Sequence, residues 1–268
     1  MRKMLLIGLL FILSSAVRAD LKLFVFDCGH LAFADISNFG LSNAETPVRE
    51  LFVPCYLIEH DNGRLLWDAG LPLDVVGPRD PEATSWYENS ILDQLLAMDL
   101  TPRDVRFAAF SHFHYDHVGA ANAFRDSTIL IQETEYVAAF EHAEDNPVFR
   151  PPLYAALQDA NRILLNGDHD VFGDGTVRII SAPGHTPGHQ VLMLQLENYG
   201  PLILSGDLYH FEASRRLRRT PVFNTDAGQT LESMDKVEAL IRETGATFWI
   251  EHNQELANTL NLAPAFYD

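Results

Sequence analysis

Four side chains able to bind a metal ion fall within six residues of this chain and directly follow an apolar, strand-like stretch at residues 106–110. They are His112, His114, Asp116 and His117. On an extended segment His112 and His114 point to the same side, and a turn after them brings Asp116 and His117 to a neighbouring position. Neutral imidazoles and carboxylates suit zinc, and this many ligands can hold two ions. Solvated loop histidines are the alternative, but so dense a cluster beside a buried strand favours a metal centre.

Three further candidates stand at the ends of later strand-like stretches. His185 lies between two Pro-Gly pairs that fix the backbone on either side of its imidazole, while Asp207 and His252 each end an apolar run. Taken singly, a histidine at a strand end is more often a hydrogen-bonded structural residue than a ligand. Together with the four residues above, these three complete two coordination shells, and we predict that all seven converge.

The distribution of apolar stretches predicts an α/β protein with two sheets and helices outside them. Strands are expected at residues 21–26, 52–59, 64–67, 106–110, 128–131, 177–181, 190–196, 202–204 and 247–250. Helices are expected at residues 90–98, 134–144, 152–160 and 230–244. Because the strands come in pairs and runs separated by helices, this order suits two sheets better than a strictly alternating barrel. No long linker divides the sequence, so we expect one domain over residues 20–268.

The segment 1–19 is predicted to be a signal peptide. Arg2 and Lys3 precede an apolar run, residues 4–17, which is too short to cross a bilayer comfortably, and small residues allow cleavage after Ala19. An uncleaved membrane anchor is the alternative. We expect the mature protein to be exported, periplasmic or secreted, and not stably inserted in a membrane after cleavage.

Charge and cysteine content narrow the function further. The 268 residues include 19 basic and 37 acidic residues, and removal of Arg2, Lys3 and Arg18 changes the net charge from -18 to -21. Such an excess of negative charge argues against a nucleic-acid partner.

The two cysteines, Cys28 and Cys55, rule out a disulfide scaffold. In an oxidising compartment they could form one disulfide, and two buried free thiols are the alternative.

The ordered motifs resemble those of the metallo-β-lactamase superfamily. The resemblance covers nearly all of the mature chain and includes an early Asp68 as well as the seven candidate ligands. It implies an αββα sandwich of two mixed sheets flanked by helices, with the metals at one edge between the sheets. It also implies two zinc ions (Zn2+) per chain on these ligands: His112, His114 and His185 on one, Asp116, His117 and His252 on the other, and Asp207 between them. Asp68 and His189 would support the ligands without binding metal.

A closer resemblance is to the N-acyl-homoserine lactone lactonases, which quench quorum signals. Residues 166–169 and 183–190 resemble the sequence around the third metal motif of these enzymes, and residues 52–58 resemble their second strand. The resemblance implies hydrolysis of a lactone ester by a hydroxide between two zinc ions. Asp116 would orient the hydroxide and pass a proton to the leaving group.

The expected partner is therefore a small molecule, a lactone or ester with an apolar acyl group. In the lactonases an extended loop at the place of residues 31–51 lies beside the acyl tail. Phe33 and Phe39 would line an apolar groove there, or else be surface residues of the loop. A dense basic run, Arg215, Arg216, Arg218 and Arg219, is either a solvated face or a positive rim that attracts an anionic group.

One departure from the lactonase pattern concerns a proton donor. Those enzymes carry a tyrosine three residues after the bridging aspartate, where this chain has His210, and its tyrosine is Tyr209. Either side chain could donate a proton to the developing alkoxide. A strand that continued past Asp207 would turn Tyr209 to the face of the aspartate, and a turn would favour His210.

Three other functions stay open at this level. One is a periplasmic β-lactamase-like enzyme, which the presence of Asp207 disfavours because true β-lactamases lack an aspartate at this place. Another is a carboxylic-ester or thioester hydrolase; the glyoxalase-II type has a further helical region after the last ligand, whereas only sixteen residues follow His252 here. The third is a non-catalytic zinc-binding protein of the same fold, against which the complete ligand set speaks.

Overall fold

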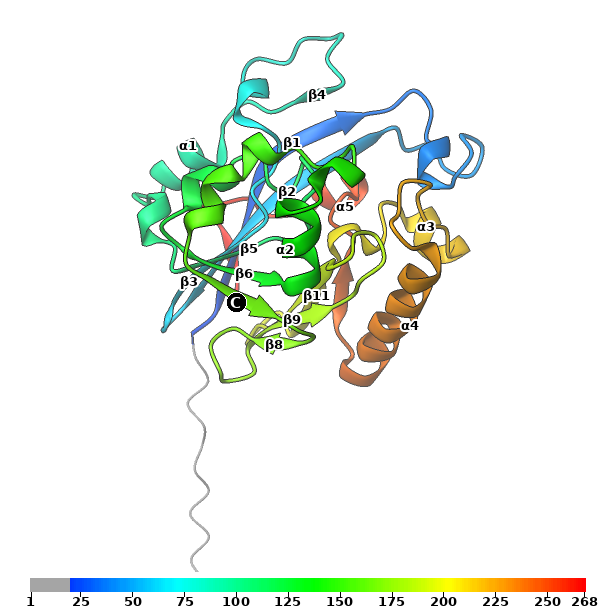
Figure 1. Ribbon diagram of the computed structural model, residues 1–268. Coiled ribbons are helices and arrows are strands. Elements are labelled where there is room, and N and C mark those ends of the chain that lie inside the picture. The colour runs from blue at the N-terminus through cyan, green and yellow to red at the C-terminus, as the bar shows by residue number, and fades with distance from the viewer. Residues whose placement is uncertain (1–19) are drawn as a thin grey trace, which may run out of the picture.

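The computed structural model describes residues 20–268 as two β-sheets stacked face to face, with helices on both outer sides (Figure 1). The predicted αββα sandwich is confirmed. Residues 1–19, where we predict the signal peptide, lie outside the described residues. Among the described residues, no helix has the length and apolar character needed to span a membrane.

The first sheet has eight strands and contains both parallel and antiparallel neighbours. Its order is β13-β1-β2-β3-β5-β6-β7, with β4 paired to β1. The strands from β1 to β3 run antiparallel to their neighbours, and those from β3 to β7 run parallel. Their bounds are β1 Lys22–Ala32, β2 Glu50–His60, β3 Gly63–Trp67, β4 Ser85–Trp86, β5 Phe107–Ala109, β6 Thr128–Gln132, β7 Arg162–Leu165 and β13 Phe266–Tyr267.

The second sheet has five strands in the order β12-β11-β10-β9-β8. β12 pairs parallel with β11, and the other pairs are antiparallel. The bounds are β8 His169–Asp170, β9 Val177–Ser181, β10 Gln190–Gln195, β11 Pro201–Leu204 and β12 Thr247–Trp249. Both sheets are therefore mixed, as expected.

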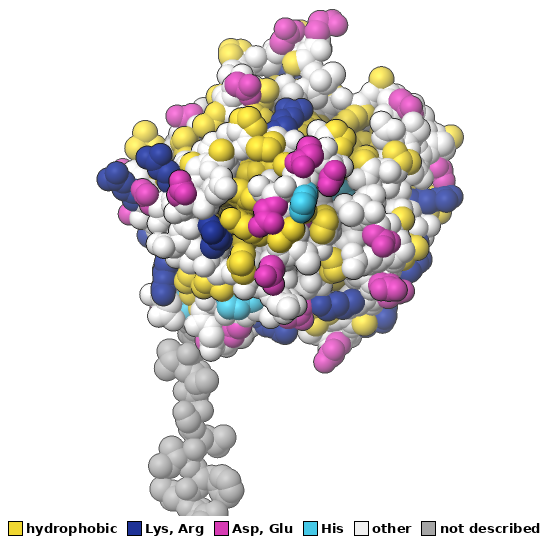
Figure 2. All heavy atoms as spheres, in the orientation of Figure 1, with side chains coloured by type: hydrophobic (Ala, Val, Ile, Leu, Met, Phe, Trp, Pro, Cys, Tyr) yellow, Lys and Arg dark blue, Asp and Glu magenta, His cyan; other side chains and the backbone are white. Residues whose placement is uncertain are grey.

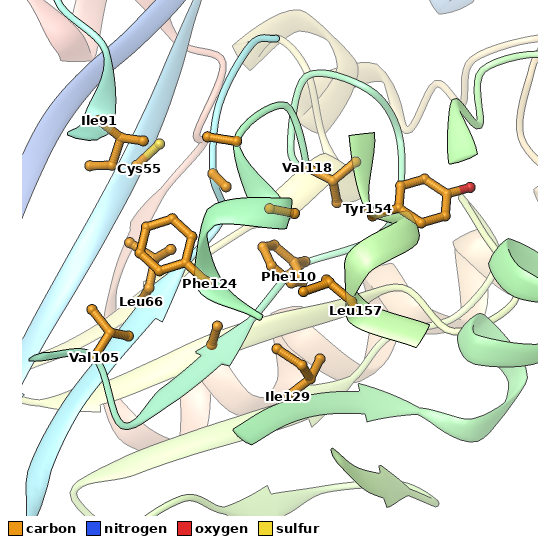
Figure 3. Packing of buried hydrophobic residues seen from close by; sticks show 14 of the residues in the cluster. Cys55, Leu66, Ile91, Val105, Phe110, Val118, Phe124, Ile129, Tyr154 and Leu157 are labelled. Carbon is orange, nitrogen blue, oxygen red and sulfur yellow. The ribbon is translucent and has the colours of Figure 1, made fainter. Parts of the chain in front are cut away.

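Alternation of side chains along the strands divides the core into layers. In β1, Leu23 and Val25 enter the core between the two sheets, whereas Phe24 and Phe26 pack on the opposite face under α1 and α2. Figure 3 shows part of that outer core, with Phe124 packed over Leu66. On the far side of the second sheet a third core packs against α4.

The helices begin and end at residues suited to those positions. They are α1 Ile91–Leu96, α2 Glu133–Phe140, α3 Glu212–Leu217, α4 Ala227–Thr244 and α5 Gln254–Ala257. Ser90 and Asp93 form a capping box at the start of α1. Asp226 accepts a hydrogen bond from the Gln229 N–H at the start of α4, and Gly245 ends that helix in the left-handed conformation.

The structure corrects one predicted helix and adds elements that the pattern did not indicate. Residues 152–160 form two 3-10 turns, Pro151–Leu153 and Ala155–Asp159, because paired prolines remove backbone donors and no helical stripe follows. The added elements are short or lie at a sheet edge: β4, β7, β8, β13, α3 and α5.

Cys28 and Cys55 form a disulfide between the neighbouring strands β1 and β2. A register shift in β1 between Asp27 and His30 accompanies it. Gly70, which follows β3, packs directly on this link, since a Cβ at Gly70 would fall 2.4 Å from the Cβ of Cys28. Of the two alternatives left open by the sequence, the structure contains the disulfide.

Candidate metal centre

The seven predicted ligands come together at one edge of the two sheets. The segment after β5 carries His112, His114, Asp116 and His117; the β9–β10 turn carries His185, and the turns after β11 and β12 carry Asp207 and His252. All seven are buried. Loops from both sheets thus meet over the core between them, which gives these polar groups a rigid base.

The side chains form two groups around one carboxylate. His112, His114, His185 and Asp207 make the first group and Asp116, His117 and His252 the second, with the potential ligand atoms of each group within 4.8 Å of one another. Asp207 Oδ2 lies 3.1 Å from His185 Nε2, and Asp207 Oδ1 lies 2.9 Å from His252 Nε2. The two oxygens of Asp207 therefore face different groups.

The hydrogen-bond pattern shows that a cation fits between these atoms. The outer nitrogens of three rings donate to oxygen: His117 Nδ1 to Asp68 (2.8 Å), His185 Nδ1 to Asn224 (2.8 Å) and His252 Nδ1 to the Phe52 carbonyl (2.7 Å). With Nδ1 as the donor, the neutral form of each ring has its lone pair on Nε2, which faces an oxygen of Asp207 that is also an acceptor.

Lone pairs that face one another need a cation between them. His112 Nε2, His117 Nε2 and Asp207 Oδ1 are buried without a hydrogen-bond partner. Nitrogen and oxygen donors in this arrangement suit zinc and related divalent ions. The residues present therefore fit a dinuclear metal centre.

Two side chains support the ligands as the sequence led us to expect. Asp68 accepts hydrogen bonds from His117 Nδ1 and from the Ser111 backbone N–H, the latter at 2.6 Å. His189 Nδ1 donates to the Ala182 carbonyl, and its Nε2 accepts from the Asp207 N–H at 2.9 Å. Asp68 thus orients an imidazole, and His189 fixes the backbone of the central carboxylate.

Sequence reasoning missed two buried acids that hold the ligand loops. Glu135 accepts from the Phe113 N–H (2.9 Å) and the Gly188 N–H (2.8 Å), and so joins the 112–117 segment to the β9–β10 turn. Glu251 accepts from Trp67 and Gly206. The one available signal for Glu251 was a charged residue inside an apolar strand end, directly before His252.

Burial and charge set the protonation states at the centre. Burial, followed by the neighbouring imidazoles, holds the pKa of His112 and His114 well below its usual range, which leaves them neutral as ligands must be. Burial opposes the charge of Asp207, yet the surrounding histidines keep its pKa well below normal. Burial and the charge of Asp68 raise the pKa of Glu251 to about 8.

The structure brings His210 to the centre and leaves Tyr209 outside it. His210 Nε2 lies 3.0 Å from Asp207 Oδ2, whereas the Tyr209 hydroxyl donates to Glu238 of α4 at 3.3 Å. β11 ends at Leu204 and a 3-10 turn, Gly206–Leu208, follows, so strand alternation does not continue past Asp207. The expectation that Tyr209 could serve as proton donor is therefore corrected by its position.

A cavity of about 180 Å³ opens onto the metal centre. At its base are His114, Asp116, Asp207, His210 and His252, and its walls are largely apolar: Leu31, Phe33, Phe39, Leu51, Val148 and Phe223. Both Phe33 and Phe39 line this cavity, as the groove alternative supposed. The site thus combines a polar base with apolar walls.

The neighbouring surface carries a second apolar hollow. Figure 2 shows apolar side chains gathered on the face that includes α2, with acidic side chains around them. A cavity of about 560 Å³ there is lined by Val137, Ala138, Phe149 and Pro187 among others. Of the basic run, Arg215 and Arg218 pair with Glu238 and Asp235 of α4, and Arg219 pairs with Glu45, which favours the solvated face over a positive rim.

Comparison with protein families identifies the general type of this centre. Residues 48–244 match the family model described as the metallo-beta-lactamase superfamily. A relative from Azorhizobium caulinodans, the N-acyl homoserine lactonase AttM, is 28% identical over 93% of this chain and 99% of its own length. The N-acyl homoserine lactonase AiiA of Bacillus thuringiensis subsp. kurstaki is 26% identical over 86% of this chain and 94% of its own.

Solved structures lead to the same group of proteins. A quorum-quenching N-acyl homoserine lactone lactonase superposes with a TM-score of 0.78 at 27% identity, over 91% of this chain and 97% of that one. An N-acyl homoserine lactone hydrolase with N-hexanoyl-L-homoserine at its catalytic metal centre gives a TM-score of 0.77 at 26% identity, over 91% and 98%.

Proposed function

Because the chain belongs to the metallo-beta-lactamase superfamily, we propose that it is a dinuclear zinc hydrolase that opens the lactone ring of N-acyl homoserine lactones. One observation carries the proposal: Asp207 directs its two oxygens to two groups of imidazoles at the base of an apolar-walled cavity. The lactonase relatives, which match over nearly the whole chain, support the choice of substrate.

Ring opening requires water to add to the lactone carbonyl carbon and the ring C–O bond to break, which leaves a carboxylate and a hydroxyl group. Two zinc ions held by the seven ligands would supply Lewis acidity and make water more acidic. Asp116 lines the cavity with Oδ2 3.8 Å from His252 Nε2. Its carboxylate takes the proton of the attacking water and returns it to the leaving alkoxide.

His210 and the apolar walls complete the site. The His210 imidazole reaches the base of the cavity, where its N–H stabilises the oxyanion that develops on the carbonyl. Phe33, Phe39 and Leu51 remove apolar surface of the acyl chain from water and hold the ring over the base.

The test is a substrate panel on purified residues 20–268 loaded with zinc. N-hexanoyl-homoserine lactone, a chromogenic cephalosporin, a thioester and a phosphodiester are offered side by side, and acid release is followed as pH drift. We expect one proton per lactone consumed and much slower turnover of the other three. Zinc-loaded protein that released no acid from short or long acyl lactones would refute the lactonase assignment.

We further propose that the protein is exported. The basic Arg2 and Lys3 before the apolar run 4–17 support this, and so does the Cys28–Cys55 disulfide, a bond typical of oxidising compartments. Cell fractionation with N-terminal sequencing tests it: mature protein beginning at Asp20 outside the cytoplasm is expected. Full-length protein that stayed in the cytoplasm would contradict the proposal.

A further inference from the structure

Glu251 is a buried acid under the metal centre that takes no part in the reaction described above. It is 2% exposed and directly precedes the ligand His252. One of its carboxylate oxygens lies within 4.8 Å of atoms of both Asp68 and His117. Burial of an unpaired polar group costs free energy, and of the two carboxylate oxygens Oε1 has hydrogen-bond partners, whereas Oε2 is buried without one.

The first partner of Glu251 is the turn that presents Asp207. Oε1 accepts a hydrogen bond from the Gly206 N–H at 3.0 Å, and the Glu251 N–H donates to Ser205 Oγ at 3.1 Å. Gly206 has a φ of 49°, and a Cβ there would lie 2.6 Å from His189 Nε2. This turn is thus tightly enclosed: Glu251 accepts from the Gly206 N–H, and His189 accepts from the next N–H along the chain, that of Asp207.

The second partner comes from the other sheet. The indole N–H of Trp67, the last residue of β3, donates to the same Oε1 at 3.2 Å. Trp67 directly precedes Asp68, which orients His117. One oxygen of Glu251 therefore receives donors from both sheets, next to the carboxylate that faces both groups of ligands and next to the carboxylate that orients one of them.

We infer that Glu251 is a positioning residue of the metal centre, which ties Trp67 of the first sheet to Gly206 of the second and so sets Asp207 relative to the Asp68–His117 pair. Asp207 Oδ1 lies 3.2 Å from His117 Nε2, so a shift of the Gly206 turn alters the spacing on which both ligand groups depend. The inference concerns metal binding and is independent of the substrate, so failure of the lactone assay would leave it intact.

The experiment compares Glu251→Leu and Glu251→Gln with the parent protein. Leucine leaves two buried N–H donors unpaired, whereas the glutamine carbonyl still accepts from both. We expect Glu251→Leu to weaken metal affinity about 10- to 100-fold, measured by competition with a chelator, since groups that orient ligands have effects of that size. We also expect altered cobalt(II) absorption bands and faster hydrogen exchange at residues 205–208. Glu251→Gln should restore parent-like values for all three.

Ser127→Ala is the matched control, because the buried Ser127 hydroxyl donates to the Val105 carbonyl before β5 and β6 begin, whereas the ligand segment 112–117 follows the end of β5. It should lower the unfolding temperature without a change in metal affinity or cobalt spectrum. A Glu251→Leu protein that behaved like this control would overturn the inference.

Should the leucine variant fail to fold, Trp67→Phe removes one of the two donors with little change of volume. We then expect metal affinity to fall by less than about 10-fold and the cobalt(II) absorption bands to shift. Parent-like metal binding in Trp67→Phe, or loss of metal binding in Glu251→Gln, would overturn the inference as well.

Discussion

Histidine and aspartate meet at both ends of the first sheet, with different outcomes. At the end of β2, opposite the metal centre, His60 Nε2 lies 2.9 Å from Asp174, its Nδ1 accepts from the Asn62 N–H, and its ring stacks on Phe172 at 4.0 Å. Every polar atom of that imidazole has a partner. At the metal centre, in contrast, His112 Nε2, His117 Nε2 and Asp207 Oδ1 have none.

This difference shows how a buried structural histidine can be distinguished from a buried metal ligand. At His60 each ring nitrogen has one complementary partner: Nε2 donates to Asp174, and Nδ1 accepts from the Asn62 N–H. This imidazole needs no further ligand. At the metal centre acceptors face acceptors, so the arrangement is complete only with a cation. Burial and proximity to aspartate are common to both ends, and the direction of the lone pairs separates them.

Removal of metal should separate the two ends most strongly. A chelator should abolish lactone hydrolysis. It should also lower the unfolding temperature, because a metal ion whose free concentration is about 1,000 times its Kd adds about 4 kcal/mol to the free energy of unfolding. Added zinc should restore both. His60→Gln protein should contain as much metal as the parent by elemental analysis. Full activity of the chelated protein would contradict the assignment of a catalytic metal to one end of the sheet.

Asp116→Asn sharpens the comparison within the metal centre. The amide cannot take a proton from water, so turnover should fall by about 10² to 10⁴-fold, the range typical of a general base. Circular dichroism and thermal unfolding should show a folded protein. Unchanged kcat would contradict the role that we assign to Asp116.

His210→Gln and Tyr209→Phe test neighbouring residues that point to different places. Loss of the His210 imidazole should reduce kcat about 10²-fold, as for loss of one oxyanion donor. Tyr209→Phe should change kcat little, because the hydroxyl it removes donates to Glu238 outside the cavity. A larger loss of kcat in Tyr209→Phe than in His210→Gln would contradict the roles that the positions of the two side chains support.

The smallest effect is expected at the His60 end. Burial alone would raise the pKa of Asp174, but hydrogen bonds from Thr176 and His60 lower it from 3.8 to about 2. A carboxylate with a lowered pKa stabilises the fold above its unfolded pKa, and this contribution is lost as the pH falls from about 4 to 2. Asp174→Asn should lower the unfolding temperature by a few degrees at pH 7 and flatten its decline below pH 4, with kcat unchanged. A change in metal content would contradict the separation of the two ends.

Much of this molecule was predictable because its signals are local. The spacing of the ligands from His112 to His117 indicates a metal site by itself. The apolar runs predict the bounds of most strands to within a few residues. Asp207 and His252 could be added because each ends such a run, and His185 because Pro-Gly pairs flank it shortly after another. The two-sheet architecture followed from the order of strands and helices.

What escaped prediction depends on contacts between distant segments. Glu135 and Glu251 look like ordinary acids until the fold brings backbone N–H groups to them. Tyr209 and His210 could not be separated, because the choice depends on a 3-10 turn that Gly206 makes possible. Asn224, which holds His185, lies 39 residues away in sequence without a pattern that links the two.

The Cys28–Cys55 bond encloses the part of the chain that forms one side of the cavity. Leu31, Phe33, Phe39 and Leu51 all lie between the two cysteines, whereas every metal ligand lies beyond them in sequence. The segment is therefore a covalently closed ring anchored at its neck to β1 and β2. Reduction by a thiol would leave the neck of this segment held by the pairing of β1 with β2. Because Phe52 within it accepts a hydrogen bond from the ligand His252, loosening of the cavity wall would reach one ligand directly, whereas the other six have no such link to the segment among the described hydrogen bonds.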